Sequence, residues 1–223
     1  MWPERVDLTV FASVSMTLDG FIAPDGMDLE HVDDPGHKDW MAKWSDLQKW
    51  ILGQKFFREN LGLGEGGETG PDNQFIEKTF ERTGASIMGK RMFDAGERLW
   101  PEEAPFHTPV FVVTHEPRDP WERPGGTTFH FVNDGIESAL GQALEAAGNR
   151  DIRIAGGANT IAQFLNTGLI DEITISLAPV LFGGGTALFD EVDDSVGLDI
   201  SGTSASELVT HLHHRVRRGQ PSS

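Results

Sequence analysis

The chain of 223 residues contains no cysteine. Disulfide bonds, thiolate zinc sites and a cysteine nucleophile are therefore excluded, and the composition fits a reducing cytoplasm. Long apolar runs are also missing, because no stretch approaches the roughly 20 residues that a membrane helix needs. The first residues, MWPERVDLTV, show no basic segment followed by an apolar one, as a secretory signal would. We therefore expect a cytoplasmic protein.

Positive charge is scarce. The chain has 18 Lys and Arg residues against 35 Asp and Glu residues, and its formal net charge is −17. Nucleic acids and anionic membrane surfaces repel such a chain at long range, so we expect neither as a partner. If the ligand is itself an anion, local cations and backbone N–H groups must overcome this repulsion. The binding site is therefore to be sought where such groups gather.

Apolar residues that alternate or form short runs predict strands, and a period of about 3.6 residues predicts helices. Helices are predicted near Lys38–Arg58, from Asp72 as an N-cap, after an Asp134–Glu137 capping box, and after Gly157. Strands that alternate with helices predict an α/β fold with a doubly wound, mostly parallel sheet, and the strand-rich C-terminus predicts antiparallel edge strands. We expect one domain over residues 1–223. Strands are predicted at 6–13, 85–90, 109–117, 127–132, 151–155, 171–179 and 206–218.

Two long segments, about 23–37 and 60–71, show no apolar period and are typical of lids, binding loops or mobile loops. The second contains a G-x-G-x-x-G pattern, Gly62–Gly67. This pattern follows a predicted helix instead of a strand, and Glu65 would direct negative charge at a pyrophosphate. We therefore interpret it as a loop and not as a dinucleotide-binding motif.

Two glycines stand where a predicted strand meets a predicted helix, in the sequence RIAGGANT. Gly156 and Gly157 lack Cβ atoms, so an anion can approach the main chain there. The N–H groups of Ala158, Asn159 and Thr160 would lie at a helix N-terminus, which favours anions. The alternative, a strand-to-helix turn without a ligand, explains this element equally well by itself.

Two further strand ends add polar groups. In IMGKRMF, Gly89 is followed by Lys90 and Arg91, and VVTHEP ends in Thr114 and His115. The carboxyl ends of parallel strands meet at one edge of a sheet, where such folds bind ligands. Lys90 or Arg91 on a ribose 2′-phosphate would select NADPH over NADH. Together the three strand ends predict a site for this cofactor.

The segments FASVSMTLDGFIAPDG, ASIMGKRMF, PVFVVTHEP and IRIAGGANTIAQFLNTGLIDEITISLAPVLFGGG resemble the dihydrofolate-reductase-like superfamily. The similarity is to the RibD C-terminal branch, which contains the 5-amino-6-(5-phosphoribosylamino)uracil reductase of riboflavin biosynthesis. It covers most of the chain in order. The resemblance implies an NADPH-dependent reductase of a small heterocyclic or sugar-like substrate, often a homodimer.

The resemblance also implies residue roles. Gly89, Lys90 and Arg91 would hold the 2′-phosphate side of the cofactor, and Thr114 and His115 would lie near the adenosine ribose. The segment Gly156–Thr160 would wrap the pyrophosphate, with Gly156–Gly157 as a candidate cis peptide. The motif SMTLDGFIA would place Asp19 and Ile22 beside the nicotinamide and the substrate, with Asp19 as the catalytic group that polarises or protonates the acceptor.

Two departures from the family leave the acceptor open. The acids Asp39 and Asp46 do not match the pterin-binding carboxylate of folate reductases, and the segment 31–70 is a long insertion that we expect to reshape the substrate pocket. A pterin or dihydrofolate reductase is therefore one alternative. A module that binds a nucleotide and dimerises without catalysis is another.

Three other motifs have simpler interpretations. In HLHH, alternation places His211 and His213 on one strand face and His214 on the other, without an acidic partner at metal spacing, so we expect no metal site. The tryptophans Trp40, Trp44 and Trp50 are typical of a core or a pocket wall. The LFGGG segment, 181–185, fits a loop that faces the substrate, a dimer edge or a bare turn.

Overall fold

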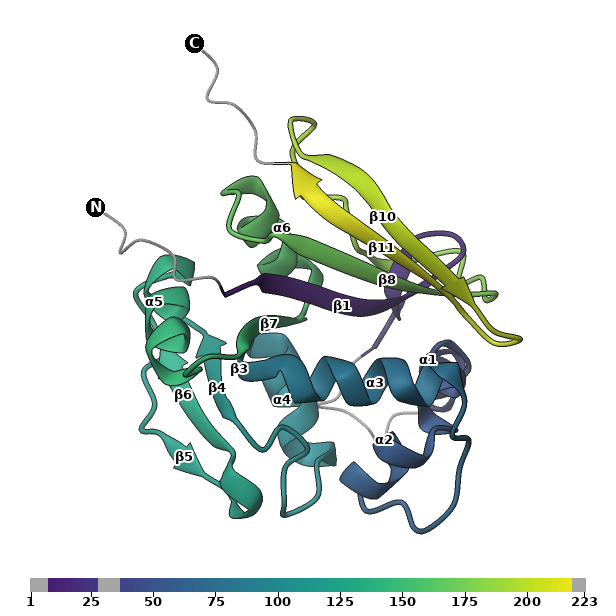
Figure 1. The fold of residues 1–223 in the computed structure, drawn as a ribbon, viewed down its shortest axis with the longest axis horizontal. Helices are drawn as coiled ribbons and strands as arrows, with labels where there is room; N and C mark the ends of the chain where they lie inside the picture. The colour runs from purple at the N-terminus through teal and green to yellow at the C-terminus, as the bar shows by residue number, and fades with distance from the viewer. Residues whose placement is uncertain (1–7, 28–36, 218–223) are drawn as a thin grey trace.

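The computed structural model describes residues 8–27 and 37–217, which form a central mixed sheet with helices on both faces (Figure 1). The strand order is β10-β11-β8-β1-β7-β3-β4-β6-β5, and β2 pairs with β9 in a separate two-stranded sheet. The strands are β1 (Val10–Thr17), β2 (Phe21–Pro24), β3 (Thr83–Gly89), β4 (Pro109–Val113), β5 (Trp121–Glu122), β6 (Thr128–Val132), β7 (Asp151–Gly156), β8 (Glu172–Ala178), β9 (Gly185–Ala187), β10 (Gly197–Ala205) and β11 (Thr210–Arg217).

The directions of the strands match the predicted class. Neighbouring strands are parallel from β8 through β1, β7, β3 and β4 to β6. The C-terminal strands β11 and β10 add to this sheet in antiparallel fashion. The predicted α/β class, the mostly parallel sheet and the antiparallel C-terminal edge are therefore confirmed. The helices are α1 (His37–Leu52), α2 (Lys55–Asn60), α3 (Pro71–Arg82), α4 (Lys90–Leu99), α5 (Ile136–Ala146) and α6 (Ala158–Asn166), with a 3₁₀ turn at Pro124–Gly126.

The sheet face covered by α5 and α6 is apolar and holds the main core. Alternate residues of the central strands point to this side, including Ala12, Ile154 and Ile173, and all three are fully buried. They pack against Leu140 of α5 and Phe164 of α6. Burial of each Ile, Leu or Phe side chain in this core stabilises the fold by about 1.5–3 kcal/mol.

On the opposite face, the strands β1, β7 and β8 carry polar side chains under α1 and α3, whereas Phe93 of α4 packs in a second apolar cluster with Met88 of β3 and Val112 of β4. Ser13 and Ser15 of β1 and Ser176 of β8 alternate with the apolar core residues, as does Arg153 of β7. These strands therefore offer hydrogen-bonding groups to a ligand on this face, whereas their other face is closed by apolar packing.

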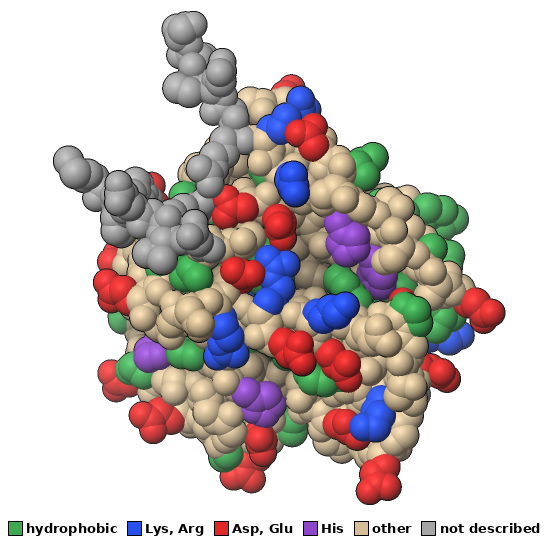
Figure 2. Space-filling model, viewed as in Figure 1, with side chains coloured by type: hydrophobic (Ala, Val, Ile, Leu, Met, Phe, Trp, Pro, Cys, Tyr) green, Lys and Arg blue, Asp and Glu red, His purple; other side chains and the backbone are tan. Residues whose placement is uncertain are grey.

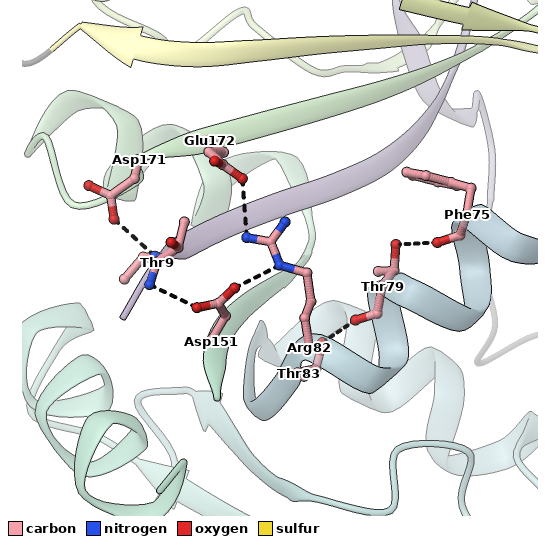
Figure 3. Close-up of polar contacts among 9 residues, drawn as sticks. Thr9, Phe75, Thr79, Arg82, Thr83, Asp151, Asp171 and Glu172 are labelled. Atoms are coloured by element: carbon pink, nitrogen blue, oxygen red, sulfur yellow. Dashed lines mark hydrogen bonds and ion pairs between the residues drawn. The ribbon is translucent and has the colours of Figure 1, made fainter. Parts of the chain in front are cut away.

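Arg82, near the C-terminal end of α3, connects the amino ends of the central strands (Figure 3). Its Nε donates to Asp151 Oδ2 at 2.7 Å, and its Nη2 donates to Glu172 Oε2 at 3.1 Å. Asp151 also accepts a hydrogen bond from the backbone N–H of Thr9. These contacts fix one end of α3 over the polar face of the sheet.

The prediction of one continuous helix over Lys38–Arg58 is wrong, because α1 ends at Leu52 and a separate helix, α2, begins at Lys55. Gln54 between them is extended, with φ −81° and ψ 138°. The backbone of Glu68 pairs with this break, since Lys55 N donates to its carbonyl and its own N–H donates to Gly53 O, both at 2.9 Å. A pairing between residues distant in sequence interrupts the helix, and helical periodicity cannot report it.

Both predicted side-chain caps are also wrong. The N-cap of α3 is Gly70, with Pro71 at the first helical position, so Asp72 lies inside the first turn and is buried. The N-cap of α5 is Gly135, at φ 102°, and no side chain caps that helix. Glycine adopts this positive φ readily, which explains why Asp134 does not occupy the cap position.

The first strand is displaced from its predicted place. It was expected at 6–13, but β1 runs from Val10 to Thr17 and pairs with β8 as far as Thr17 and Ala178. Residues 6 and 7 lie outside the described part of the chain, as do 28–36 of the predicted loop and insertion. The strands β2, β5, β9 and β10 were not predicted; β10 is mostly exposed and shows no apolar alternation.

Acidic side chains spread over the face of the molecule that Figure 2 shows, with Lys and Arg side chains interspersed among them, in keeping with the net charge of −17. Across residues 8–27 and 37–217, no helix combines the length and the apolar character needed to cross a membrane.

Candidate functional site

A cavity of about 2050 Å³ extends from the carboxyl ends of the central strands to the helices α1, α3 and α4. Ile22, predicted beside the substrate, lines it, whereas Asp19 is not among its lining residues. The cavity wall contains every residue predicted to bind the cofactor: Gly89, Lys90, Arg91, Thr114, His115, Gly156, Gly157, Ala158, Asn159 and Thr160.

The structure brings the three predicted strand ends together. In the sheet Met88 is the partner of Gly156, and Gly89 is the partner of Val113, so β7, β3 and β4 end side by side. Thr114 follows β4 directly and is buried, and its hydroxyl accepts the N–H of Glu116 at 3.0 Å. The edge of the sheet thus offers backbone and short polar groups to the cavity.

The Gly156–Gly157 turn leads from β7 into α6, and its peptide bond is cis, as the family resemblance implied. The first N–H of α6 that bonds back into the helix is that of Ile161, to Gly157 O at 3.0 Å. The N–H groups of Ala158, Asn159 and Thr160 therefore precede the intrahelical bonds. A Cβ built on Gly157 would meet no atom within 4 Å, so open space lies in front of this turn.

Gly89 allows the end of β3 to pack closely against the beginning of α6. A Cβ at Gly89 would lie 2.5 Å from Oγ1 of Thr160, which is itself buried. This close packing explains why glycine stands at the end of β3, two residues before Arg91.

The two cations after β3 differ in their partners. Lys90 Nζ lies 2.8 Å from both carboxylate oxygens of Asp94 and 3.5 Å from Glu116, and the hydrogen bond to Asp94 is the main reason that the pKa of Lys90 is raised. Arg91 is exposed, and no ion pair joins it to another residue of the described chain. Of this pair, Arg91 is the one available to an external anion.

Acidic groups also border the cavity. Asn159 donates a short hydrogen bond from its side chain to Glu191, and it accepts one from Gln163 at 2.7 Å. Asp190 and Glu191 both belong to the cavity wall. The side chain of Asn159 is therefore engaged within the protein, and its backbone N–H is the group it offers to a ligand.

Asp19 connects two turns. Its carboxylate accepts the N–H groups of Phe182, at 3.1 Å, and Gly183, at 2.7 Å. The hydrogen bond from Thr17 is the main reason that the pKa of Asp19 is lowered, and these two N–H groups add to it. The carboxylate is therefore ionised near neutral pH and holds the β1–β2 turn against the segment before β9. Its predicted catalytic role stays a prediction.

A polar chain that the motifs did not reveal lies in the cavity wall under α3. Ser176 Oγ is 2.9 Å from Nδ1 of His211, and Nε2 of His211 is 3.3 Å from Oδ1 of Asp72. All three side chains are buried, and Ser176 lines the cavity. The residues come from β8, β11 and α3, so only the tertiary fold brings them together.

Burial is the main cause of the lowered pKa of His211, although the hydrogen bond to Asp72 acts in the opposite direction. A neutral imidazole that donates from Nε2 to the Asp72 carboxylate must accept at Nδ1. The hydroxyl of Ser176 then donates to His211, and the lone pairs of its oxygen remain for the cavity. Ser176 is thereby set as a hydrogen-bond acceptor.

Helix α1 supplies much of the remaining wall. Trp50 Nε1 donates to Ser15 Oγ, and Ser15 Oγ donates to Gln48 Oε1, both at 3.1 Å. Trp40 and Trp50 are almost fully buried, and both line the cavity together with Trp44. The interpretation of these tryptophans as core or pocket wall is confirmed. The cavity wall formed by α1 is aromatic, and the amide of Gln48 and the hydroxyl of Ser15 on β1 are its polar groups here.

The remaining motifs lie elsewhere or serve the fold. His211 and His213 share a face as predicted, and His213 pairs with Thr174 at 3.0 Å. Within the described residues, no three His, Asp or Glu side chains form a group that could hold a metal ion. The Gly62–Gly67 segment is an exposed loop outside the cavity, whereas Gly185 at the end of LFGGG begins β9 and lines the cavity.

Comparison with known proteins agrees with this architecture. The family model described as RibD C-terminal domain matches residues 8–212. Among solved structures, a protein of Shewanella sp. PV-4 described as a riboflavin biosynthesis protein has a TM-score of 0.64 at 22% identity, over 95% of this chain and 100% of that chain. Dihydrofolate reductase from Enterococcus faecalis, complexed with NADP(H), has a TM-score of 0.52 at 13% identity, over 95% and 97% of the two chains. At these identities the structural similarity shows the fold.

Sequence relatives come from Bacillus subtilis (strain 168). The uncharacterized protein YyaP is 35% identical over 86 residues, which are 38% of this chain and 45% of YyaP. The uncharacterized protein YwjB is 32% identical over 84 residues, which are 38% of this chain and 48% of YwjB. The chain thus matches about half the length of these relatives.

Proposed function

The chain belongs to the RibD C-terminal domain family, and from this premise we propose that it is an NADPH-dependent reductase of a small heterocyclic substrate. The observation that carries the proposal is the convergence of three parallel strand ends and the N-terminus of α6 on one cavity, with open space at Gly157. This is the arrangement that binds phosphates in open α/β sheets.

The residues at this edge fit a phosphorylated dinucleotide. The free N–H groups of Ala158, Asn159 and Thr160 would hold the pyrophosphate, and the missing side chain of Gly157 leaves room for it. Arg91 would pair with the 2′-phosphate, because the charge of Lys90 is already engaged by Asp94. Thr114 and His115 would border the ribose. The bound cofactor would supply the hydride for an acceptor C=N or C=O carbon.

The polar face of the sheet would hold the acceptor beside the cofactor. Ser176, held as an acceptor by His211, would bind an N–H group of the substrate. The amide of Gln48 and the aromatic side chains of α1 would form the wall around a flat ring. This combination supports a nitrogen heterocycle as the substrate, and it orients the ring while the helices limit the access of water.

Asp19, which lies outside the cavity wall, would act either on the substrate or by positioning the turn that leads to Ile22 of β2. Its hydrogen bonds to Phe182 and Gly183 favour the second role. A cytoplasmic homodimer belongs to the same proposal; Ile200, exposed on the edge strand β10, is one apolar group that a second copy could cover. Sedimentation equilibrium of the purified chain tests the dimer.

A direct test is to mix the purified protein with NADPH and candidate acceptors and to follow the absorbance of the reduced cofactor. The uracil intermediate of riboflavin biosynthesis and dihydrofolate separate the two reductase classes. Oxidation of NADPH with either acceptor supports a reductase. Saturable binding of NADPH without turnover on any acceptor would favour a nucleotide-binding module, and no binding at all would overturn the proposal.

A further inference from the structure

Arg153 of β7 is a cation in the cavity wall for which the described chain provides no counter-charge. Its Nε is buried without a hydrogen-bond partner. Its guanidinium carbon lies 5.2 Å from the ring centroid of Phe80, on α3. No ion pair connects Arg153 with any carboxylate in residues 8–27 and 37–217. Among the described residues, the guanidinium is therefore contacted by an aromatic ring and by no carboxylate.

Arg82 is a structural arginine of the same protein, and its charge is paired. It lies over the same sheet face, stacks on Phe11 at 4.0 Å, and forms ion pairs with both Asp151 and Glu172. Removing a guanidinium from water without an anionic partner is strongly unfavourable. Burial lowers the pKa of Arg153 to about 10, so the group remains charged at neutral pH. A charge of this kind is expected where a ligand supplies the partner.

The position of Arg153 separates it from the cofactor edge. It stands three residues before Gly156 on β7, which corresponds to roughly 10 Å along the strand. Phe75 and Phe80 of α3 belong to the wall of the same cavity, and Phe80 is the ring beside Arg153. A flat molecule with one end at the Gly156 edge could therefore reach Arg153 with its other end.

We propose that Arg153 binds an anionic group, a carboxylate or a phosphate, at the far end of the substrate, so that the acceptor is an acidic heterocycle. This inference rests on the proposed function, because it takes the cavity as the substrate site. The planar guanidinium can donate two parallel hydrogen bonds to either anion. Arg153 is then a specificity-determining residue that fixes which end of the substrate points away from the cofactor.

The test uses the full chain and three small aromatic probes: benzoate, phenyl phosphate and the neutral benzamide. Binding is followed by the fluorescence of the cavity tryptophans, and NADPH is titrated separately into every variant. We expect at least one of the two acids to bind the unmodified protein and benzamide to bind more weakly. Arg153→Met should weaken acid binding by about 10- to 100-fold, since it removes a hydrogen-bonded charge. The preference between benzoate and phenyl phosphate identifies the anion.

Three variants separate recognition from folding. Arg153→Met should raise the midpoint of thermal unfolding, because it replaces a half-buried charge, which has no ion-pair partner among the described residues, by an apolar chain. It should leave NADPH affinity unchanged. Arg153→Lys keeps the charge without the planar fork, so its acid affinity should be intermediate. Arg91→Gln is the matched control, which should retain acid binding while NADPH affinity falls.

Acids that bind Arg153→Met as tightly as the unmodified protein would overturn the proposal, as would a protein that binds neither acid more tightly than benzamide. A lower unfolding midpoint in Arg153→Met, with acid binding intact, would identify a purely structural arginine. If NADPH binds neither the unmodified protein nor any variant, while acid binding still depends on Arg153, the proposed cofactor is refuted and the anion site stands.

Discussion

Nε2 of His211 lies 3.3 Å from Oδ1 of Asp72, although 139 residues separate the two in the chain. The pair joins the C-terminal strand β11 to the first turn of α3, behind Ser176, which lines the cavity. Because Ser176 bonds to the other ring nitrogen, the protonation state of His211 decides whether the Ser176 hydroxyl acts as a donor or an acceptor toward the cavity.

The first prediction concerns the pH dependence of stability. Burial lowers the pKa of His211 below its ordinary value of 6.5 in the folded protein. Below pH 6.5 the unfolded chain therefore takes up a proton that the folded chain resists, so the free energy of unfolding should fall as the pH falls through 6.5 to the folded pKa. Urea unfolding between neutral and mildly acidic pH measures this. His211→Gln should flatten the slope, whereas a slope equal to that of the exposed His115→Gln control would contradict it.

The second prediction concerns the choice between the two dinucleotides. Arg91→Ala should weaken NADPH by about tenfold or more, the usual effect of a lost charged hydrogen bond, and leave NADH almost unchanged. Lys90→Ala is the matched control and should have the smaller effect, because Asp94 already engages Lys90. Fluorescence titration of both cofactors checks this. Equal losses for NADPH and NADH in Arg91→Ala would remove the 2′-phosphate role.

The third prediction separates two neighbouring glycines. A side chain at Gly157 meets open space, so Gly157→Val should fold normally but lose cofactor binding, because its methyl groups occupy the space in front of α6. Gly156 has φ 137°, and a Cβ there would lie 3.0 Å from Met92 Sδ, so Gly156→Ala should lower the unfolding midpoint. Thermal unfolding and NADPH titration measure both effects. Retained binding in a folded Gly157→Val protein would refute a close backbone approach.

The fourth prediction tests the role of Asp19. Asp19→Asn removes the charge that faces the N–H groups of Phe182 and Gly183. We expect turnover to fall more than NADPH affinity. If Asp19 positions the turn, Thr17→Val should have a similar effect, because it removes the other hydrogen-bond partner. Steady-state kinetics with a working acceptor compares the two variants; a large loss of turnover in Asp19→Asn alone would indicate direct chemistry, and no loss in either would dismiss both roles.

The sequence predicts those parts of the protein that depend on neighbouring residues. Gly89 marks the end of β3 and the Gly156–Gly157 pair marks the end of β7, and the common direction of these strands brings the two ends to one edge. The fold class and the edge that we propose for the cofactor follow from this regularity. The helix break at Gln54 could not be predicted in the same way, because it depends on a backbone pairing with Glu68.

The polar groups that we propose for the substrate could not be predicted from the sequence for the same reason. Asp72 has the position of a helix cap in the sequence, and His211 belongs to a run of histidines that suggests a metal. Only the packing of α3 over β8 and β11 joins them to Ser176. Arg153 gave no signal either, because an arginine in an amphipathic strand is typical of an exposed face, and its burial depends on Phe80.

The unequal faces of the sheet have a consequence for how this protein could change over time. The side under α5 and α6 contains the main apolar core, whereas the side under α1 to α3 contains the cavity and its polar side chains. Substitutions that retune acceptor choice would fall mostly on the second side, away from the principal source of folding energy. New acceptor specificities should therefore be reachable in small steps, while the strand ends that we propose for the nucleotide stay unchanged.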